Sequence, residues 1–286
     1  MFAELIALYS AMGWAGDAVL VRLGTKRSNI IAAMLVSYAV SVGCMAAYVL
    51  LTRPLDFFGS PAMGYFLMSG CLQPLFARAL YYEGLIRIGV SRAGPLRGAE
   101  PLFASLIGVS LLHERPTALV YIGTVLIVAS VWLVSRRGSQ QSNWRLRDAA
   151  LPLAAALVSA VSQTLRKQGL KILPDPFIAT VTVTSTSLVL FLTFVYTTRR
   201  AELLRVKRES LFFFIGAACF AVSAQVTNFV AIGNGDLSVI IPLLNTTPLF
   251  TVTFSSLFLR NVETVTPNVM LGAIVMIAGV LCITLR

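Results

Sequence analysis

The residues most able to do chemistry in this sequence are charged side chains placed inside apolar stretches. Arg97 and Glu100 lie three residues apart, and Pro95 and Pro101 stand on either side of them. Residues at this spacing share one face of a helix. Pro101 has no N–H to donate to the carbonyl of Arg97, so a backbone acceptor is freed beside the two charges. A guanidinium, a carboxylate and a free carbonyl at one point are suited to holding a zwitterionic solute.

A second charged group stands earlier in the chain. Arg78 is followed by Tyr81 and Tyr82, three and four residues on, so the guanidinium and the phenols share a helical face. An arginine fork can pair with a carboxylate through two hydrogen bonds, and tyrosine offers an apolar face with a polar tip. We expect these residues to receive the solute together with Arg97 and Glu100. The alternative is that Arg78 or Arg97 only neutralises Glu100 and holds the helices in register.

The elements that position these residues occur twice. Residues 95–103 read PLRGAEPLF and residues 242–250 read PLLNTTPLF, and five of the nine positions are identical. A proline inside a helix removes a backbone hydrogen bond and kinks or breaks the helix. Matched breaks in the two halves of a duplicated membrane protein are the best sequence pointer to a binding site near the bilayer midplane. The prolines that we expect to act as breaks or gates are Pro95, Pro101, Pro242 and Pro248.

The composition is that of a membrane protein. Hydrophobic residues make up 57% of the chain and charged residues 12%, which lies outside the range of soluble domains. A stretch of about 20 apolar residues crosses a hydrocarbon core about 30 Å thick. We therefore predict an all-α membrane protein with ten transmembrane helices. The apolar stretches are 3–21, 30–51, 64–86, 91–112, 118–135, 149–168, 177–197, 210–231, 237–258 and 267–285.

Five of these stretches fall in each half of the chain. We expect a first repeat over 1–137, a linker loop over 138–148 and a second repeat over 149–286. Because five is odd, the second repeat enters the bilayer from the opposite side, and a pseudo-two-fold axis in the membrane plane relates the two inverted repeats. Two such halves can exchange conformations around one central site, which is the basis of alternating access. This duplication needs no second chain to complete its symmetry, so we expect a monomer.

The first helix of each half carries a polar stripe with the spacing i, i+4 and i+7, which places its members on one helical face. We expect both stripes to line the central site. The alternative for Asp17 is an ion pair with Arg22 or Arg166 near a helix end. The stripes consist of Ser10, Trp14 and Asp17 in the first half and of Ser159, Gln163 and Arg166 in the second.

The second half has neutral hydrogen-bonding groups where the first half has charges. An offset of 147 residues relates the late parts of the two halves, and at this offset Arg78 corresponds to Gln225 and Tyr81 to Asn228. Asn245 stands beside the second proline-containing break. We expect these three neutral residues to complete an asymmetric site for an asymmetric solute. The alternative is simple hydrogen bonding between helices, worth about 0.6 kcal/mol per contact in membranes.

The net charge of +11 does not indicate a nucleic-acid partner, because the basic residues stand mostly at the ends of the apolar stretches. Fifteen Lys and Arg residues fall on one side of the predicted membrane and six on the other. Since loops rich in Lys and Arg remain in the cytoplasm, we expect both termini to lie outside it. The lipid bilayer is then the surrounding partner of the chain.

The LLHERP sequence at 111–116, the AGV at 278–280, the ten helices and the proline in the fourth helix of each half resemble the drug/metabolite transporter superfamily, and within it the EamA family. The resemblance covers essentially the whole chain, but the Glu114–Arg115 pair is not repeated in the second half. It implies a secondary transporter of a bacterial inner membrane that exports amino acids or related small metabolites, in its finer form a YddG-type aromatic amino acid exporter. Alternative solutes for this fold are drugs and cations, sugar phosphates and nucleotide sugars.

An integral-membrane enzyme is the rival from another class. His113 is the sole histidine, and the sequence contains no H-E-x-x-H, G-x-S-x-G or Walker loop. A channel is not indicated either, because no filter motif is present. The four cysteines are single residues in apolar stretches, so we expect them to be small buried hydrophobic residues. We therefore expect no enzyme activity, no cofactor and no metal, and a small molecule as the bound partner.

Overall fold

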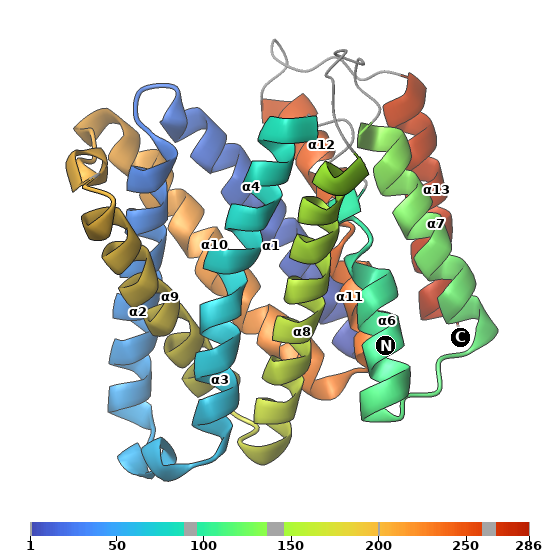
Figure 1. The fold of residues 1–286 in the computed structure, drawn as a ribbon, viewed down its shortest axis with the longest axis horizontal. Coiled ribbons are helices and arrows are strands. Elements are labelled where there is room, and N and C mark those ends of the chain that lie inside the picture. The colour runs from blue at the N-terminus through green and yellow to red at the C-terminus, as the bar shows by residue number, and fades with distance from the viewer. Residues whose placement is uncertain (1, 89–95, 136–145, 200, 259–266, 286) are drawn as a thin grey trace.

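The fold is a bundle of helices, as the computed structural model shows over residues 2–88, 96–135, 146–199, 201–258 and 267–285 (Figure 1). None of these residues lies in a strand, so the predicted all-α class is confirmed. Helices of the first half are α1 (Phe2–Thr25), α2 (Ile30–Thr52), α3 (Ala62–Cys71), α4 (Ala77–Ile88), α6 (Glu100–Leu112) and α7 (Ala118–Ser135). Those of the second half are α8 (Ala150–Ile172), α9 (Pro176–Thr197), α10 (Arg208–Asn234), α11 (Leu237–Leu244), α12 (Thr247–Phe258) and α13 (Pro267–Thr284).

Four of the helices are individually long and apolar enough to cross a membrane, namely α1, α2, α9 and α10. The third predicted span is made of α3 and α4, and the ninth is made of α11 and α12. Pro95 and most of the predicted linker 138–148 lie outside the described residues. The ten spans are those of an inverted five-plus-five repeat, as the sequence predicts.

The fourth helix of each half is interrupted at the same place. In the first half a turn at residues 98–99 precedes α6, with Pro101 in its first turn. In the second half a turn at residues 245–246 separates α11 from α12, with Pro248 in the first turn of α12. The two turns are related by the 147-residue offset of the repeat. Proline is favoured at a helix start, where its missing N–H costs nothing.

A further break in the third helix of the first half was not predicted. Gln73 has φ −137° and ψ 133°, which is extended backbone inside a helical span. Pro74 follows it, and a residue before proline is pushed out of the helical region by the proline ring. The corresponding helix of the second half, α10, contains no proline and runs without interruption. The predicted span over 64–86 is therefore made of two helices that meet at Gln73 and Pro74.

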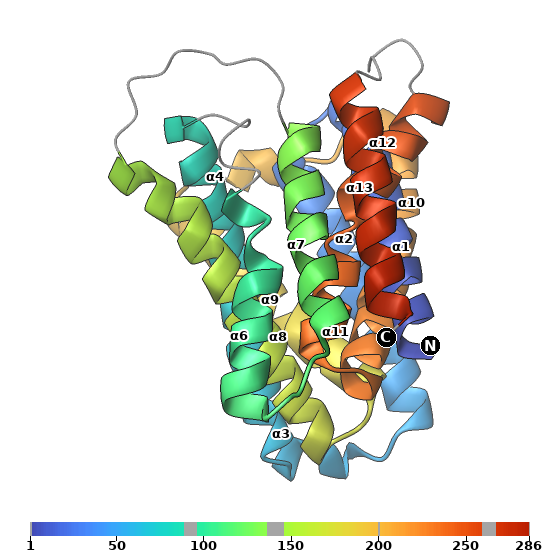
Figure 2. The same cartoon turned by 90° about the vertical axis from the view of Figure 1, so that its right-hand side faces the viewer.

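The two halves are interleaved rather than side by side. The first helix of each half packs against the third helix of the other half, so that α1 lies on α10 and α8 lies on α3 and α4. Further contacts between the halves join α6 with α8 and α11, and join two pairs of equivalent helices, α2 with α9 and α7 with α13; the last pair lies side by side in Figure 2. A pseudo-two-fold axis exchanges the first two pairings and maps the α2–α9 and α7–α13 pairs onto themselves. The core is consequently shared by both repeats.

The pair α7 and α13 shows how closely two backbones approach in this bundle. A Cβ atom on Gly123 would lie 2.6 Å from the carbonyl oxygen of Gly279, and one on Gly279 would lie 2.9 Å from the carbonyl oxygen of Gly123. Contacts this short require glycine at both positions. Small residues that let helix backbones meet are typical of helix packing in membranes.

The cysteines correct one prediction. All four are free, but Cys44, Cys71 and Cys219 are exposed and Cys282 is half-buried, so the expectation that they are buried is wrong. The outer surface of the bundle carries many exposed large hydrophobic side chains, such as Leu51. In a membrane protein this surface faces lipid, and lipid accepts an apolar side chain as readily as a protein core does.

Candidate functional site

The break that precedes α6 holds a buried ion pair. The Arg97 guanidinium donates from Nη1 to Oε2 of Glu100 at 2.6 Å and from Nη2 to the Ser159 hydroxyl at 2.7 Å. The Glu100 side chain is 7% exposed and that of Arg97 is 22% exposed. The pairing of Arg97 with Glu100 that the sequence offered as an alternative is therefore present. Because Ser159 belongs to α8, the same guanidinium joins the two halves of the chain.

The polar stripe of α8 continues this cluster along one helical face. The Gln163 side-chain oxygen accepts from Nη1 of Arg166 at 3.2 Å, and Nε of Arg166 donates to the Ser69 hydroxyl of α3 at 2.9 Å. The Arg166 guanidinium lies over the ring of Phe229 in α10, 5.2 Å from its centre, which is a cation–π contact. Ser159 and Arg166 thus bond to the first half of the chain, and Gln163 bonds to Arg166.

Arg166 was predicted to line the central site as a member of the α8 stripe, but no solute group was assigned to it. Its side chain is almost fully buried, at 3% exposure, and it interacts electrostatically with Glu100. No carboxylate in the described part of the chain forms an ion pair with it. Its position as the third member of the α8 stripe was the available signal. We define the central cluster as Arg97, Glu100, Ser159, Gln163 and Arg166; two guanidinium groups and one carboxylate leave it with one excess positive charge.

Neutral polar residues predicted for the site are buried nearby on α10. Gln225 and Asn228 are 8% and 5% exposed, and Asn228 immediately precedes Phe229 in the chain. The Asn228 Oδ1 atom is buried and has no hydrogen-bond partner among the described residues. The same holds for Oε1 of Gln73, at the break between α3 and α4. A buried acceptor without a donor carries a free-energy cost of about 1–3 kcal/mol, which a bound donor would relieve.

The stripe of α1 is used differently from that of α8. The Ser10 hydroxyl donates to the carbonyl oxygen of Ala224 in α10 at 2.8 Å, so it serves helix packing. Trp14 and Asp17 are half-buried. The guanidinium that acts electrostatically on Asp17 is that of Arg78, on α4.

Arg78 and Tyr81 are both half-buried on α4, and the Tyr82 side chain lies outside the described residues. Arg78 acts electrostatically on Asp17, while the ion pair of Glu100 is with Arg97. The polar groups of the first half therefore fall into two sets, one around Glu100 and one around Asp17.

At the second break the side chains satisfy the backbone of their own helix. The Asn245 amide donates to the carbonyl of Ile241 at 2.9 Å, and the Thr247 hydroxyl donates to the carbonyl of Leu244 at 2.8 Å. Pro248 cannot donate to Leu244, because it has no N–H. The Thr247 hydroxyl replaces that missing donor. Asn245 is half-buried and closes α11, so its predicted role in solute binding finds no separate support in its contacts.

The sequence profile of the EamA-like transporter family matches residues 1–136 and 149–285. This chain belongs to the EamA-like transporter family. One crystal structure is similar to it with a TM-score of 0.77 at 12% sequence identity, over 99% of this chain and 96% of that chain. At this identity the likeness shows the fold alone. A search of curated proteins finds no significant match.

Membership of this family makes the chain a membrane-embedded transporter of the drug/metabolite transporter type, with the fold that the sequence predicts. It is consistent with the expectation that the chain is not an enzyme. Across the described ranges, His, Cys, Asp and Glu form no group of three or more that could hold a metal ion.

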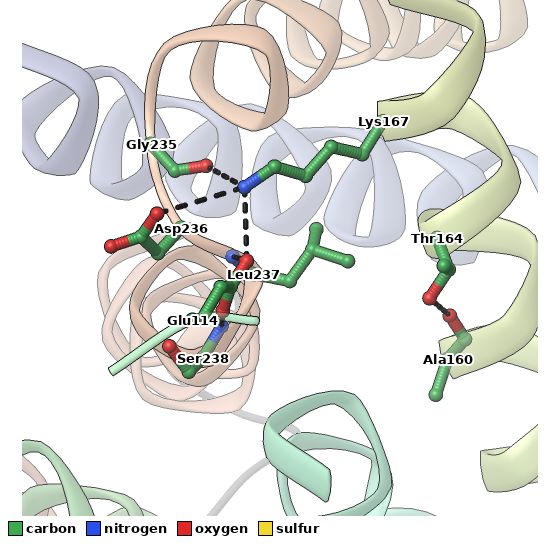
Figure 3. Close-up of polar contacts among 8 residues, drawn as sticks. All are labelled: Glu114, Ala160, Thr164, Lys167, Gly235, Asp236, Leu237 and Ser238. Carbon is green, nitrogen blue, oxygen red and sulfur yellow. Dashed lines mark hydrogen bonds and ion pairs between the residues drawn. The ribbon is translucent and has the colours of Figure 1, made fainter. Parts of the chain in front are cut away.

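The EamA-like chain places its Glu114 in a contact that sequence reasoning did not foresee. Glu114 follows the end of α6, where His113 adopts a left-handed conformation with φ 56° that turns the chain. Its carboxylate accepts hydrogen bonds from the backbone N–H groups of Leu237 and Ser238, at 2.8 and 3.0 Å, which are the first residues of α11 (Figure 3). A carboxylate at a helix N-terminus satisfies free N–H groups and is favoured by the helix dipole.

Lys167 of α8 completes this contact from a third element. Its Nζ atom donates to Oε1 of Glu114 at 3.0 Å and to the carbonyl oxygen of Gly235 at 2.9 Å, and it lies 3.8 Å from Asp236 (Figure 3). Burial raises the pKa of the Glu114 carboxyl, but the two backbone N–H groups and the Lys167 ammonium outweigh burial and hold this pKa below its ordinary value. Glu114 is therefore ionised at neutral pH.

Proposed function

We propose that this EamA-like transporter exports amino acids, with aromatic or large neutral ones favoured, or related small metabolites across a bacterial inner membrane by alternating access. The chain acts as a monomer in this proposal, with the central cluster as its solute site. The observation that carries it is the pairing of Arg97 and Glu100 at the break before α6, held against Ser159 of the other half.

The charges of the cluster suit a zwitterion. A solute carboxylate would find the guanidinium groups of Arg97 and Arg166, and a solute ammonium would find Glu100. A buried charge without a counter-charge is costly, and such residues in membrane spans mark solute pathways. The excess positive charge of the cluster therefore favours a solute with a carboxylate over a purely cationic one.

The apolar part of the solute would meet rings and neutral groups. Phe229 lies directly against Arg166, and Trp14 and Tyr81 are half-buried on α1 and α4. Aromatic rings can take up an apolar side chain, while the free acceptor of Asn228 can accept from an ammonium or hydroxyl group. This combination supports amino acids with large side chains.

The test is counterflow in proteoliposomes. Vesicles preloaded with one unlabelled amino acid at a time are given the labelled form, with no ion gradient imposed, beside protein-free vesicles. We expect uptake of phenylalanine, tryptophan and leucine by the wild-type chain. Absence of uptake for every amino acid, with correctly folded protein, would overturn the amino acid assignment and direct the search to sugar phosphates, nucleotide sugars and cationic drugs.

A matched pair of variants locates the site. Glu100→Gln removes the carboxylate of the central cluster and is expected to abolish counterflow. Glu83→Gln removes the carboxylate of another Arg–Glu pair of helical spacing, in which Glu83 accepts from Arg87 at 2.8 Å but lies exposed. Counterflow should be unchanged in Glu83→Gln. Equal loss in both variants would show that any such pair is needed for folding rather than for solute binding.

A further inference from the structure

We infer that Glu114 is the gate of one face of this transporter: its carboxylate, held by Lys167 and by the start of α11, closes the face that carries the 113–117 connection and must be released before solute can cross there. This inference rests on alternating access in the proposed function, but it does not depend on which solute is carried. Glu114 and Lys167 are positioning residues in this scheme, since neither belongs to the central cluster.

The contact joins four separate parts of the chain at one point. Glu114 comes from the end of α6 in the first half and bonds to Lys167 of α8 and to the start of α11 in the second half, while Lys167 also donates to the Gly235 carbonyl at the end of α10. The side chains are nearly buried, at 5% exposure for Glu114 and 10% for Lys167. The Glu114 carboxylate therefore bridges the two halves on this face.

The partners of Glu114 in this contact do not recur at the equivalent sequence positions of the first half. At the 149-residue offset of the first helices Lys167 corresponds to Ala18, and at the 147-residue offset Gly235 and Asp236 correspond to Ile88 and Gly89. The sequence at 114–115 has no repeat in the second half either. The Glu114 contact would therefore stabilise the state in which this face is closed, without an equal contribution to the state in which the other face is closed.

The gate is mechanically linked to the central cluster through two helices. The first residue of α6 is Glu100, and Glu114 lies two residues after the last. On α8, Arg166 of the cluster and Lys167 of the gate are neighbours in the chain. A displacement of α6 or α8 that accompanies solute binding therefore also displaces a partner of the gate.

The chemistry of the contact suits a gate that opens and closes repeatedly. Hydrogen bonds between a carboxylate, an ammonium group and helix N–H groups are charge-assisted and stronger than neutral ones. Glu114 and the N–H groups of Leu237 and Ser238 lie at helix ends, so water can replace these partners when the face opens. The closed state is thus stabilised without leaving unsatisfied charges in the open state.

Cysteine accessibility tests the gate directly. Ser238 is fully buried beside Glu114, and its hydroxyl has no hydrogen-bond partner among the described residues, so Ser238→Cys gives up no bond of the side chain. The reporter is placed in a chain whose four native cysteines are replaced by alanine, and a membrane-impermeant maleimide is added to oriented vesicles. With Glu114 intact we expect slow labelling; in Glu114→Gln we expect labelling about tenfold faster, equivalent to about 1.4 kcal/mol.

Asp175→Asn is the matched control. Asp175 also caps a helix, accepting from Phe177 and Ile178 of α9 at 2.9 and 3.1 Å, and pairs with Arg53 at 2.6 Å. It too joins the halves on this face, but α2 and α9 carry none of the residues of the central cluster. Labelling of the reporter should be unchanged in Asp175→Asn. Equal acceleration in both variants would mean general loosening of the face and would overturn the gate.

A second variant protects the test against misfolding of the first. Lys167→Met removes the ammonium while leaving Glu114 on the α11 N–H groups, and it should also speed labelling. Fast labelling of Ser238→Cys with Glu114 and Lys167 intact would overturn the inference. So would labelling that stays unchanged in both Glu114→Gln and Lys167→Met when both variants are folded. Since labelling requires no solute, accelerated labelling together with absent amino acid counterflow would leave the gate standing and refute only the substrate.

Discussion

The two interrupted fourth helices differ in what their breaks do with polar groups. At the second break, the side chains of Asn245 and Thr247 donate hydrogen bonds to carbonyl groups of α11, so these polar groups are satisfied within the same span. At the first, Arg97 and Glu100 pair with each other, and Arg97 reaches across to Ser159. Glu100 stands where the second half has Thr247, and a carboxylate cannot donate to a freed carbonyl as a hydroxyl does.

The two breaks share a backbone shape but differ in the chemistry of their side chains. Duplication gave both halves the same interrupted backbone, because the prolines stand at equivalent positions. The side chains then diverged, so that one break is a neutral kink and the other holds charge at depth. A solute with two unlike ends needs such a difference, since a symmetric site would bind it equally well in two opposed orientations.

The largest effect should come from breaking the charged pair. Arg97→Met leaves Glu100 buried and unpaired, and we expect this to lower the free energy of unfolding by about 3–5 kcal/mol. Thermal unfolding in detergent measures this loss. The double variant Arg97→Met with Glu100→Met should regain most of the stability, yet remain without counterflow. Recovery of transport in the double variant would show that the pair is structural only.

Arg166 should behave in the opposite way. No carboxylate in the described part of the chain forms an ion pair with it, so Arg166→Met removes a charge without breaking an ion pair, and the free energy of unfolding should change by no more than about 1 kcal/mol despite two lost hydrogen bonds. Counterflow should nevertheless fall at least tenfold for solutes with a carboxylate. A stability loss as large as that of Arg97→Met would contradict this prediction and would indicate that Arg166 compensates a buried negative charge.

The neutral break should tolerate change. Thr247→Val removes the hydroxyl that donates to the carbonyl of Leu244, which should cost about 1 kcal/mol of stability and leave counterflow near its wild-type rate. Denaturant unfolding and counterflow measured on the same preparation give both values. Loss of transport without loss of stability would assign solute binding to the second break as well.

The smallest predicted effect is a pH-dependent change in stability at Glu114, where the end of α6 meets the start of α11. Because the pKa of Glu114 is lower in the folded chain than its ordinary value of 4.5, its contribution to stability is present above that value and is lost as the pH falls through the folded pKa. Melting temperatures measured downward from pH 6 should show this loss. Glu114→Gln should show a smaller decline over the same range; an identical decline would remove Glu114 as its source.

Much of the fold could be predicted because its signals are local. Apolar length fixes the spans, and the repeated prolines at 101 and 248 fix the matched breaks. The break at Gln73 was missed although Pro74 supplies its cause, since this proline has no partner in the second half to draw attention to it. The exposed cysteines were missed because apolar residues on the lipid-facing surface have the same sequence signal as those in a core.

The site was predicted less completely, for a different physical reason. Arg97 and Glu100 are close in the chain, so their helical spacing reveals their pairing. Arg166 finds Ser69, and Glu114 finds Lys167 and α11, across separations that only the packed bundle defines. Local sequence identifies charged residues at depth, but it does not say which distant helix supplies each partner.

The interleaved packing of the two halves has a consequence for how the chain is made. α1 ends at Thr25, and its main partner α10 begins at Arg208, so α1 enters the bilayer long before that partner exists. At about 5–20 residues per second, ribosomes need roughly 10–40 s to synthesise the intervening chain. Through this interval the Ser10 hydroxyl lacks the Ala224 carbonyl that it later bonds. Assembly of the first half is therefore completed only after translation of the second, and the nascent protein depends on lipid or insertion machinery to shelter its early helices.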